Sequence, residues 1–143
     1  MTNIDLTGHW TGTIIYGKQY SRMAGKELYF DMELIQNDNE IAGTAVDIGG
    51  VGMSPDQAYI LGSVKDIEIN FIKQYTSSHF YSSKGDETKI DKSKKGPRIK
   101  YQGFYNPEDE TIIGEWQINM TVFLLYILPI PFKNSGTWTM KRK

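Results

Sequence analysis

The chain has 143 residues and a formal net charge of −1, from 16 basic and 17 acidic side chains. This length fits one domain that buries its own core, and the balanced charge excludes a globally basic nucleic-acid binder. The absence of cysteine excludes disulfide frameworks and thiol catalysis, and two histidines are too few for a multi-histidine metal centre. We therefore expect no metal and no cofactor, and we assign no catalytic residue.

Alternation of apolar and polar residues with a period of two predicts eight strands. In chain order they run over Gly8–Gly17, Lys26–Gln36, Ile41–Gly49, Gln57–Lys65, Ile67–Tyr75, Arg98–Tyr105, Thr111–Met120 and Ser135–Arg142. Short connections join several of them: Asn37-Asp38-Asn39 tolerates positive φ, and Pro107 presets a type I turn. Consecutive strands with short turns predict one all-β domain over residues 1–143, an eight-stranded antiparallel up-and-down barrel.

Two connections differ from the others. Residues 76–97 form a long polar loop, and Lys84–Lys100 carries seven basic and three acidic residues. This composition favours a solvated loop, with attraction of anionic ligands or acidic partners as the alternative. Residues 121–134 read TVFLLYILPIPFKN and form an apolar loop. Pro129 and Pro131 argue against one continuous central strand there.

An apolar loop of this length must be buried, because otherwise it promotes aggregation. It can cover the barrel mouth as a lid, form an oligomer contact, enter a membrane interface or accept a partner protein. The lid and the oligomer contact are favoured, because Lys133 alone gives little attraction to a membrane. The residues that we expect to form this lid or partner surface are Phe123, Leu124, Leu125, Tyr126, Ile127 and Leu128.

A glycine-centred pattern recurs along the predicted strands. Gly-x-Trp occurs at Gly8-His9-Trp10, Gly114-Glu115-Trp116 and Gly136-Thr137-Trp138. The first of these resembles the opening strand of the calycins, the superfamily of lipocalins, fatty-acid-binding proteins and avidins. The regular recurrence and the last motif are most similar to the avidin-like branch. The resemblance covers most strands but neither long connection. It implies a barrel with an internal ligand site and favours an oligomer.

The avidin resemblance implies biotin binding, but the polar residues for it are missing. The family's first-strand Asn, third-strand Tyr and last-strand Asp fall on Gly12, Ala45 and Gly136. Each unpaired polar group in a buried site costs about 1–3 kcal/mol, so tight biotin binding is not expected. Aromatic residues are better kept, because Phe71, Tyr101 and Trp116 occupy places where avidins have Trp. We expect an avidin-like barrel without biotin chemistry.

Strand parity places a set of side chains inside the barrel when Trp10 and Trp116 are taken as inward. Two of them, Asp47 and Lys73, are charged, and Asp47 falls where avidins place a ligand-contacting Ser. Either both charges reach solvent at the rim, or they fix the polar end of an otherwise apolar ligand. The predicted ligand-binding residues are Tyr16, Asp47, Phe71, Lys73, Tyr101, Trp116 and Ile118.

Three functions follow from this sequence. The leading hypothesis is a non-catalytic binding protein that holds a small, mostly apolar ligand in the barrel. The alternative is a protein-interaction or oligomerisation module that acts through residues 122–132. The third is a cyclase- or isomerase-like enzyme, supported by fold analogy alone. We expect no nucleic-acid partner and no membrane contact. The absence of a signal peptide at the N-terminus favours the cytoplasm.

Overall fold

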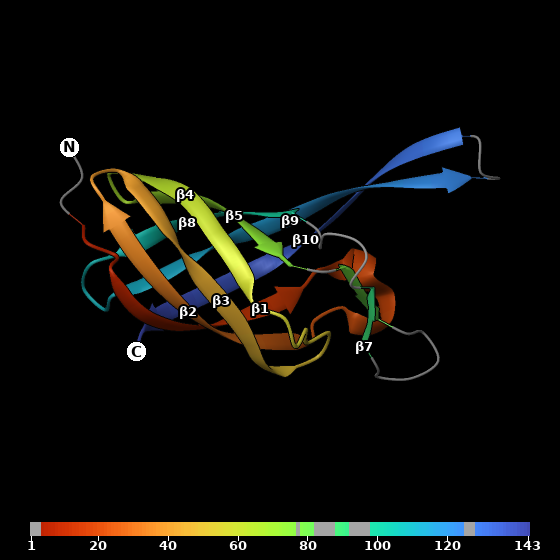
Figure 1. Cartoon of the computed structure of the whole chain (residues 1–143), viewed down its shortest axis with the longest axis horizontal. Helices are drawn as coiled ribbons and strands as arrows, with labels where there is room; N and C mark the ends of the chain where they lie inside the picture. The colour runs from red at the N-terminus through yellow and green to blue at the C-terminus, as the bar shows by residue number, and fades with distance from the viewer. Residues whose placement is uncertain (1–3, 77, 82–87, 92–97, 125–127) are drawn as a thin grey trace.

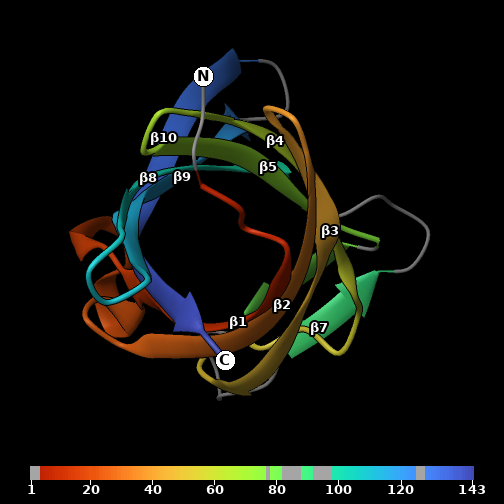
Figure 2. The same ribbon diagram turned by 90° about the vertical axis from the view of Figure 1, so that its left-hand side faces the viewer.

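The computed structural model describes residues 4–76, 78–81, 88–91, 98–124 and 128–143. Eight antiparallel strands close into a barrel in the order β1-β10-β9-β8-β5-β4-β3-β2 (Figures 1 and 2). Their bounds are β1 Gly8–Tyr16, β2 Glu27–Asn37, β3 Glu40–Gly50, β4 Ala58–Lys65, β5 Glu68–Tyr75, β8 Arg98–Asn106, β9 Thr111–Leu124 and β10 Leu128–Arg142. The predicted eight-stranded barrel is confirmed, and each predicted strand corresponds to one of these.

The polar connection between β5 and β8 contains two further strands. These are β6 (Ser78–Tyr81) and β7 (Thr88–Asp91), which pair antiparallel as a separate two-stranded sheet. One short 3-10 helix, η1 (Lys18–Met23), joins β1 to β2. No helix in the described ranges is long and apolar enough to cross a membrane.

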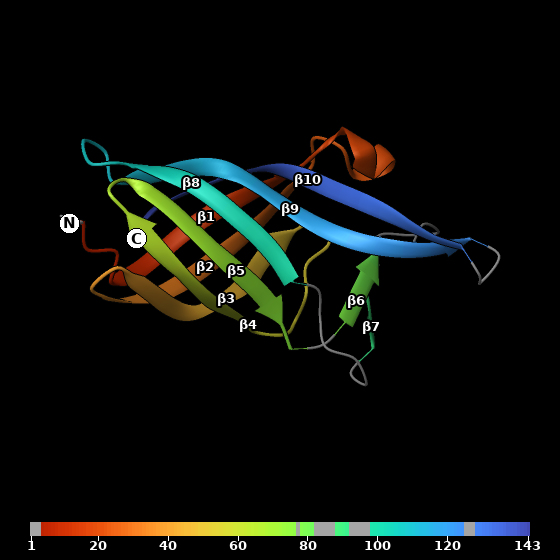
Figure 3. The same ribbon diagram turned by 90° about the horizontal axis from the view of Figure 1, so that it is seen from above.

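Within the predicted apolar loop 121–134, residues 121–124 and 128–134 belong to a strand pair, so the loop prediction is wrong for these residues. β9 and β10 stay in register as far as Leu124↔Leu128. Figures 1 and 3 show this hairpin continuing well beyond the barrel. β10 includes Pro129 and Pro131, and it pairs with β1 only from Gly136 onward. At the prolines it therefore pairs with β9 alone, and an edge strand tolerates a missing N–H.

The two ends of the barrel carry different structures. One end, the clamp end, holds the β2–β3, β4–β5 and β8–β9 turns and both ends of the described chain (Figures 1 and 3). The opposite end, the hairpin end, holds η1, the β3–β4 connection, the β6–β7 sheet and the projecting β9–β10 hairpin. The turns at the clamp end are tight, and Asp38, predicted to tolerate positive φ, has φ 55°.

Facing glycines make room for large rings in the core. Gly103 and Gly114 are register partners on β8 and β9. A Cβ at Gly103 would lie 2.7 Å from Cζ2 of Trp138, and one at Gly114 would lie 1.8 Å from the Gln102 carbonyl oxygen. The Trp138 indole N–H donates to the carbonyls of Gln102 and Glu115, at 3.2 and 3.1 Å. The predicted glycine pattern thus allows close approach between strands and around a buried indole.

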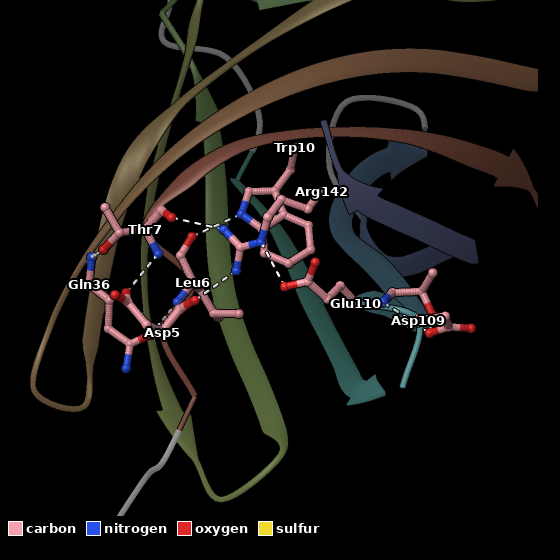
Figure 4. A network of polar contacts seen from close by, with 9 residues as sticks. Asp5, Leu6, Thr7, Trp10, Gln36, Asp109, Glu110 and Arg142 are labelled. Atoms are coloured by element: carbon pink, nitrogen blue, oxygen red, sulfur yellow. Dashed lines mark hydrogen bonds and ion pairs between the residues drawn. The ribbon is translucent and has the colours of Figure 1, made fainter. Parts of the chain in front are cut away.

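Arg142 closes the clamp end (Figure 4). Its guanidinium carbon lies 4.6 Å from the ring centroid of Trp10. Its Nη1 donates to the Thr7 carbonyl at 2.9 Å, and its Nη2 donates to the Asp5 carbonyl at 2.8 Å. The Trp10 indole N–H donates to the Leu6 carbonyl at 2.9 Å. The chain before β1 is thereby held across this end of the barrel.

Candidate functional site

An inward row of aromatic side chains crosses the hairpin half of the barrel. Register partners run from Tyr16 on β1 through Gly136 and Trp116 to Tyr101 and Phe71 on β5. The rings of Phe71 and Tyr101 stack with centroids 4.7 Å apart, and those of Tyr16 and Trp116 meet edge to face at 6.0 Å. These contacts form a rigid apolar wall, because aromatic pairs of this geometry pack favourably.

Asp47 is held beside this wall by a distortion of β3. The register of β2 and β3 shifts between Tyr29 and Phe30, so that Phe30 pairs with Asp47. Such a bulge redirects the side chains around it. The Asp47 carboxylate is buried and accepts hydrogen bonds from two donors, one of them shared between its two oxygens. The Tyr75 hydroxyl donates to Oδ1 at 2.8 Å and to Oδ2 at 2.9 Å, and the Ser54 N–H donates to Oδ2 at 2.8 Å.

Lys73 supplies the cation of the site. Its Nζ lies 3.6 Å from Oδ1 of Asp47, with the side chains 1% and 0% exposed. The ammonium also lies 4.8 Å from the ring centroid of Tyr75, 5.4 Å from that of Phe30 and 5.9 Å from that of Tyr101. Burial lowers the pKa of Lys73 from its ordinary value, and the Asp47 carboxylate opposes this effect. The aromatic faces and the carboxylate stabilise the ammonium electrostatically.

Two polar atoms in this cluster have unused hydrogen-bonding capacity. Within the described residues, neither Nζ of Lys73 nor the hydroxyl of Tyr101 has a hydrogen-bond partner, although both are buried. The neighbouring indole N–H of Trp116, in contrast, donates to the Thr137 carbonyl at 3.1 Å. Buried polar groups are normally paired, so each exception needs a reason. Burial also raises the pKa of Tyr101 well above its ordinary value, which keeps the phenol protonated.

The site is covered from the hairpin end. Tyr20 of η1 lies against Tyr16 and Trp116, with ring centroids 4.9 and 5.7 Å apart. The Tyr16 hydroxyl donates to the Val51 carbonyl at 2.8 Å, which holds the β3–β4 connection over the same region. Burial in this cover raises the pKa of Tyr20 to about 12. The cover therefore comes from η1 and the β3–β4 connection.

The structure buries all seven predicted ligand-binding residues. They are Tyr16, Asp47, Phe71, Lys73, Tyr101, Trp116 and Ile118. The interpretation that both charges reach solvent at the rim is wrong, because Asp47 is 7% exposed and Lys73 is 1% exposed. The reason is that each provides the other's counter-charge, which makes burial tolerable.

Sequence reasoning missed two members of the cluster. Tyr75 follows Phe71 and Lys73 with the same parity, so alternation along the strand could have identified it. The Ser54 N–H comes from the β3–β4 connection, where no periodicity applies. It reaches Asp47 because Gly50 and Gly52 adopt φ of 93° and 80°, which turns the chain back.

Two of the positions without avidin-type polar residues are filled by aromatic rings. A Cβ at Gly12 would lie 2.4 Å from Cζ of Phe30, and one at Gly136 would lie 2.7 Å from Nε1 of Trp116. The third position, Ala45, is buried at 2% exposure. The region around Gly12 is therefore packed with protein atoms.

The predicted lid or partner residues divide into two groups. Phe123 and Leu124 end β9 and Leu128 begins β10, whereas residues 125–127 (Leu125, Tyr126 and Ile127) lie outside the described ranges. The backbone of the hairpin leads away from the barrel and not across its end (Figure 3). This path of the described strands differs from the predicted lid.

A shallow depression of about 190 Å³ lies on the outer face of β1, β2 and β3. Polar groups that line it contact one another: Nζ of Lys143 lies 2.9 Å from Oδ2 of Asp31, and Nε2 of His9 lies 3.7 Å from Oε1 of Glu33. Among the described side chains, no group of three His, Asp or Glu residues is arranged to hold a metal ion. The buried cluster is thus the better candidate site.

Comparisons with protein-family models, with curated proteins and with solved structures give no match for this chain.

Proposed function

We propose that this protein is a non-catalytic binding protein that holds a small, mostly apolar molecule against the buried cluster in its barrel. One observation carries the proposal: Lys73 and Tyr101 each bury a polar atom without a hydrogen-bond partner among the described residues. Leaving such groups unpaired costs about 1–3 kcal/mol each. A ligand that satisfies them recovers this free energy, and a few convergent polar groups in an apolar site are typical of ligand pockets.

The aromatic row supports the same proposal. Phe71, Tyr101 and Trp116 are buried apolar rings, and their register places this row next to Lys73. The Asp47 carboxylate is engaged by the Tyr75 hydroxyl and the Ser54 N–H, which limits its availability as a general base. Positioned donors beside rigid apolar walls favour recognition over bond making.

Native mass spectrometry of the freshly purified full chain tests this proposal. We expect a native mass that exceeds an integer multiple of the chain mass, with the excess lost on denaturation. This excess mass begins the identification of the ligand. We also expect the emission of the dye Nile red to increase when the protein is added. An extract of the molecule that copurifies with the protein should reverse this increase. Native masses equal to integer multiples of the chain mass, together with unchanged Nile red emission, would overturn the proposal.

A second function is favoured by the shape of the β9–β10 hairpin. Among the described residues, the register of β9 with β8 ends at Ile118 and that of β10 with β1 ends at Gly136, while β9 and β10 stay paired as far as Leu124 and Leu128. An exposed strand edge readily pairs with another chain. We propose that residues 122–132 bind a protein surface. The partner is either another protein or a second copy of this chain.

Substitution of two apolar residues in the hairpin tests this second function. We expect Leu125→Asp combined with Ile127→Asp to yield a soluble protein of smaller assembly mass in light scattering. Ile113→Asp is the matched control, because Ile113 is 63% exposed on the barrel wall in the same strand pair. An unchanged mass for the double variant and no lost partner would refute the role of the hairpin.

A further inference from the structure

We propose that the group recognised by Lys73 and Tyr101 is an uncharged oxygen acceptor, a carbonyl or hydroxyl on an otherwise apolar molecule, and not a carboxylate. This inference rests on the binding function proposed above and specifies its ligand. It follows from counting the charges and the hydrogen-bonding capacity of the buried cluster.

In the described part of the chain, the buried charged residues are Asp47 and Lys73, one anion and one cation. The side chains packed around Lys73 are Phe30, Tyr75 and Tyr101, which carry no charge at neutral pH. The cluster is therefore neutral as a whole, and its cation already has a counter-ion at 3.6 Å.

A carboxylate ligand would give this site a net negative charge. Transfer of an ion from water into a buried site is strongly unfavourable unless an uncompensated opposite charge receives it. Here Asp47 already compensates Lys73, and its charge would repel a second anion close by. A neutral oxygen has only its dipole to desolvate, and one charge-assisted hydrogen bond offsets this cost.

The unused hydrogen-bonding capacity is mainly that of donors. A lysine ammonium has three N–H donors and no acceptor, and a tyrosine hydroxyl can donate one hydrogen bond. Both oxygens of Asp47 already accept hydrogen bonds from Tyr75. Oδ2 of Asp47 also accepts the Ser54 N–H. A ligand oxygen with free lone pairs fits these donors, whereas a ligand that only donates gives the Lys73 N–H groups no acceptor.

The strand register places the two donors on one inward face. Lys73 is the partner of Ile99, and Phe71 is the partner of Tyr101, so Lys73 and Tyr101 are diagonal neighbours across β5 and β8. Diagonal neighbours lie within reach of long and aromatic side chains. The ring of Phe71, stacked 4.7 Å from that of Tyr101 and edge to face with Trp138, continues this buried row with apolar atoms. An acceptor at the end of an apolar body matches this order of groups.

A matched pair of probes tests the inference: 2-undecanone and undecanoate, of equal carbon count and differing in the charge of the oxygen group. Isothermal titration calorimetry at neutral pH should show the ketone binding at least about tenfold more tightly than the carboxylate. Asp47→Asn leaves Lys73 without its counter-charge, so we expect this variant to gain at least about tenfold in affinity for undecanoate.

Tyr101→Phe provides a second variant that preserves shape. Loss of its donor should weaken ketone binding about fivefold, while Tyr59→Phe should leave it unchanged, since Tyr59 is 57% exposed on the outer wall. Tighter binding of undecanoate by the unmodified protein would overturn this inference and leave the binding function standing. Binding of neither probe, together with bare native masses, would overturn both.

Discussion

Each end of the barrel packs a cation against aromatic rings, but the N–H groups of the two cations have different fates. At the clamp end, Arg142 lies over Trp10 and donates to backbone carbonyls and to Glu110. At the hairpin end, Lys73 faces the Tyr75 ring, and within the described residues its ammonium has no hydrogen-bond partner. The donors of Arg142 are used to hold the fold, whereas the donors of Lys73 are unused among the described residues although its charge is paired with Asp47. Comparison of the two ends thus separates a structural role from a candidate functional one.

The largest expected effect is at Lys73. Lys73→Met should lower the free energy of unfolding by about 3–5 kcal/mol, because it leaves the Asp47 carboxylate buried without a counter-charge. Chemical denaturation followed by tryptophan fluorescence measures this loss. The double variant Lys73→Met with Asp47→Asn should recover most of it. An equally unstable double variant would mean that the ion pair is not the cause.

The next largest effect is at the clamp end. Arg142→Ala removes two hydrogen bonds to backbone carbonyls and the contact with Trp10, so we expect a loss of about 2–3 kcal/mol. Thermal unfolding measures the loss, and ketone binding at the hairpin end should not change in the folded variant. A loss of binding that matches the loss of stability would show that the two ends do not act separately.

Tyr101→Phe should have a smaller effect of opposite sign. It removes a buried hydroxyl without a partner in the described ranges, so we expect a gain of up to about 1 kcal/mol at neutral pH. Burial raises the pKa of Tyr101 in the folded protein above 10.0, its ordinary value in the unfolded chain. The folded state therefore loses stability relative to the unfolded state as pH rises above 10.0, and loses none below it. The difference between variant and unmodified protein should therefore widen above pH 10.0, which denaturation at a series of pH values measures.

The smallest expected effect is at an exposed cation. Lys143→Met removes a hydrogen bond that lowers the pKa of Asp31, and the Lys143 side chain is 59% exposed. We expect a loss below about 1 kcal/mol at neutral pH. The contribution is present above pH 3.8, the ordinary pKa of Asp31, and disappears as pH falls. A loss as large as that of Arg142→Ala would contradict the comparison.

The barrel could be predicted because alternation of apolar and polar residues indicates a strand with one buried face. The nearly continuous apolar run of residues 121–132 has no such alternation. The sequence therefore gives no sign that β9 and β10 remain paired beyond the barrel. Parity placed Asp47 and Lys73 inside, but they lie on β3 and β5, which are not neighbours in the sheet. Their approach depends on the curvature of the closed barrel and on the bulge in β3. One-dimensional spacing contains neither.

The seam between β1 and β10 has a consequence for the order of folding. It pairs Trp10 with Arg142, residues from opposite ends of the chain, and it is the contact that turns an open sheet into a barrel. During synthesis, β1 must wait with an open edge until β10 leaves the ribosome. Contacts so distant in sequence are slow to form, because the loop between them must first be closed. Ribosome-bound chains that end before β10 should therefore remain open sheets, vulnerable to proteases and to pairing with other nascent chains.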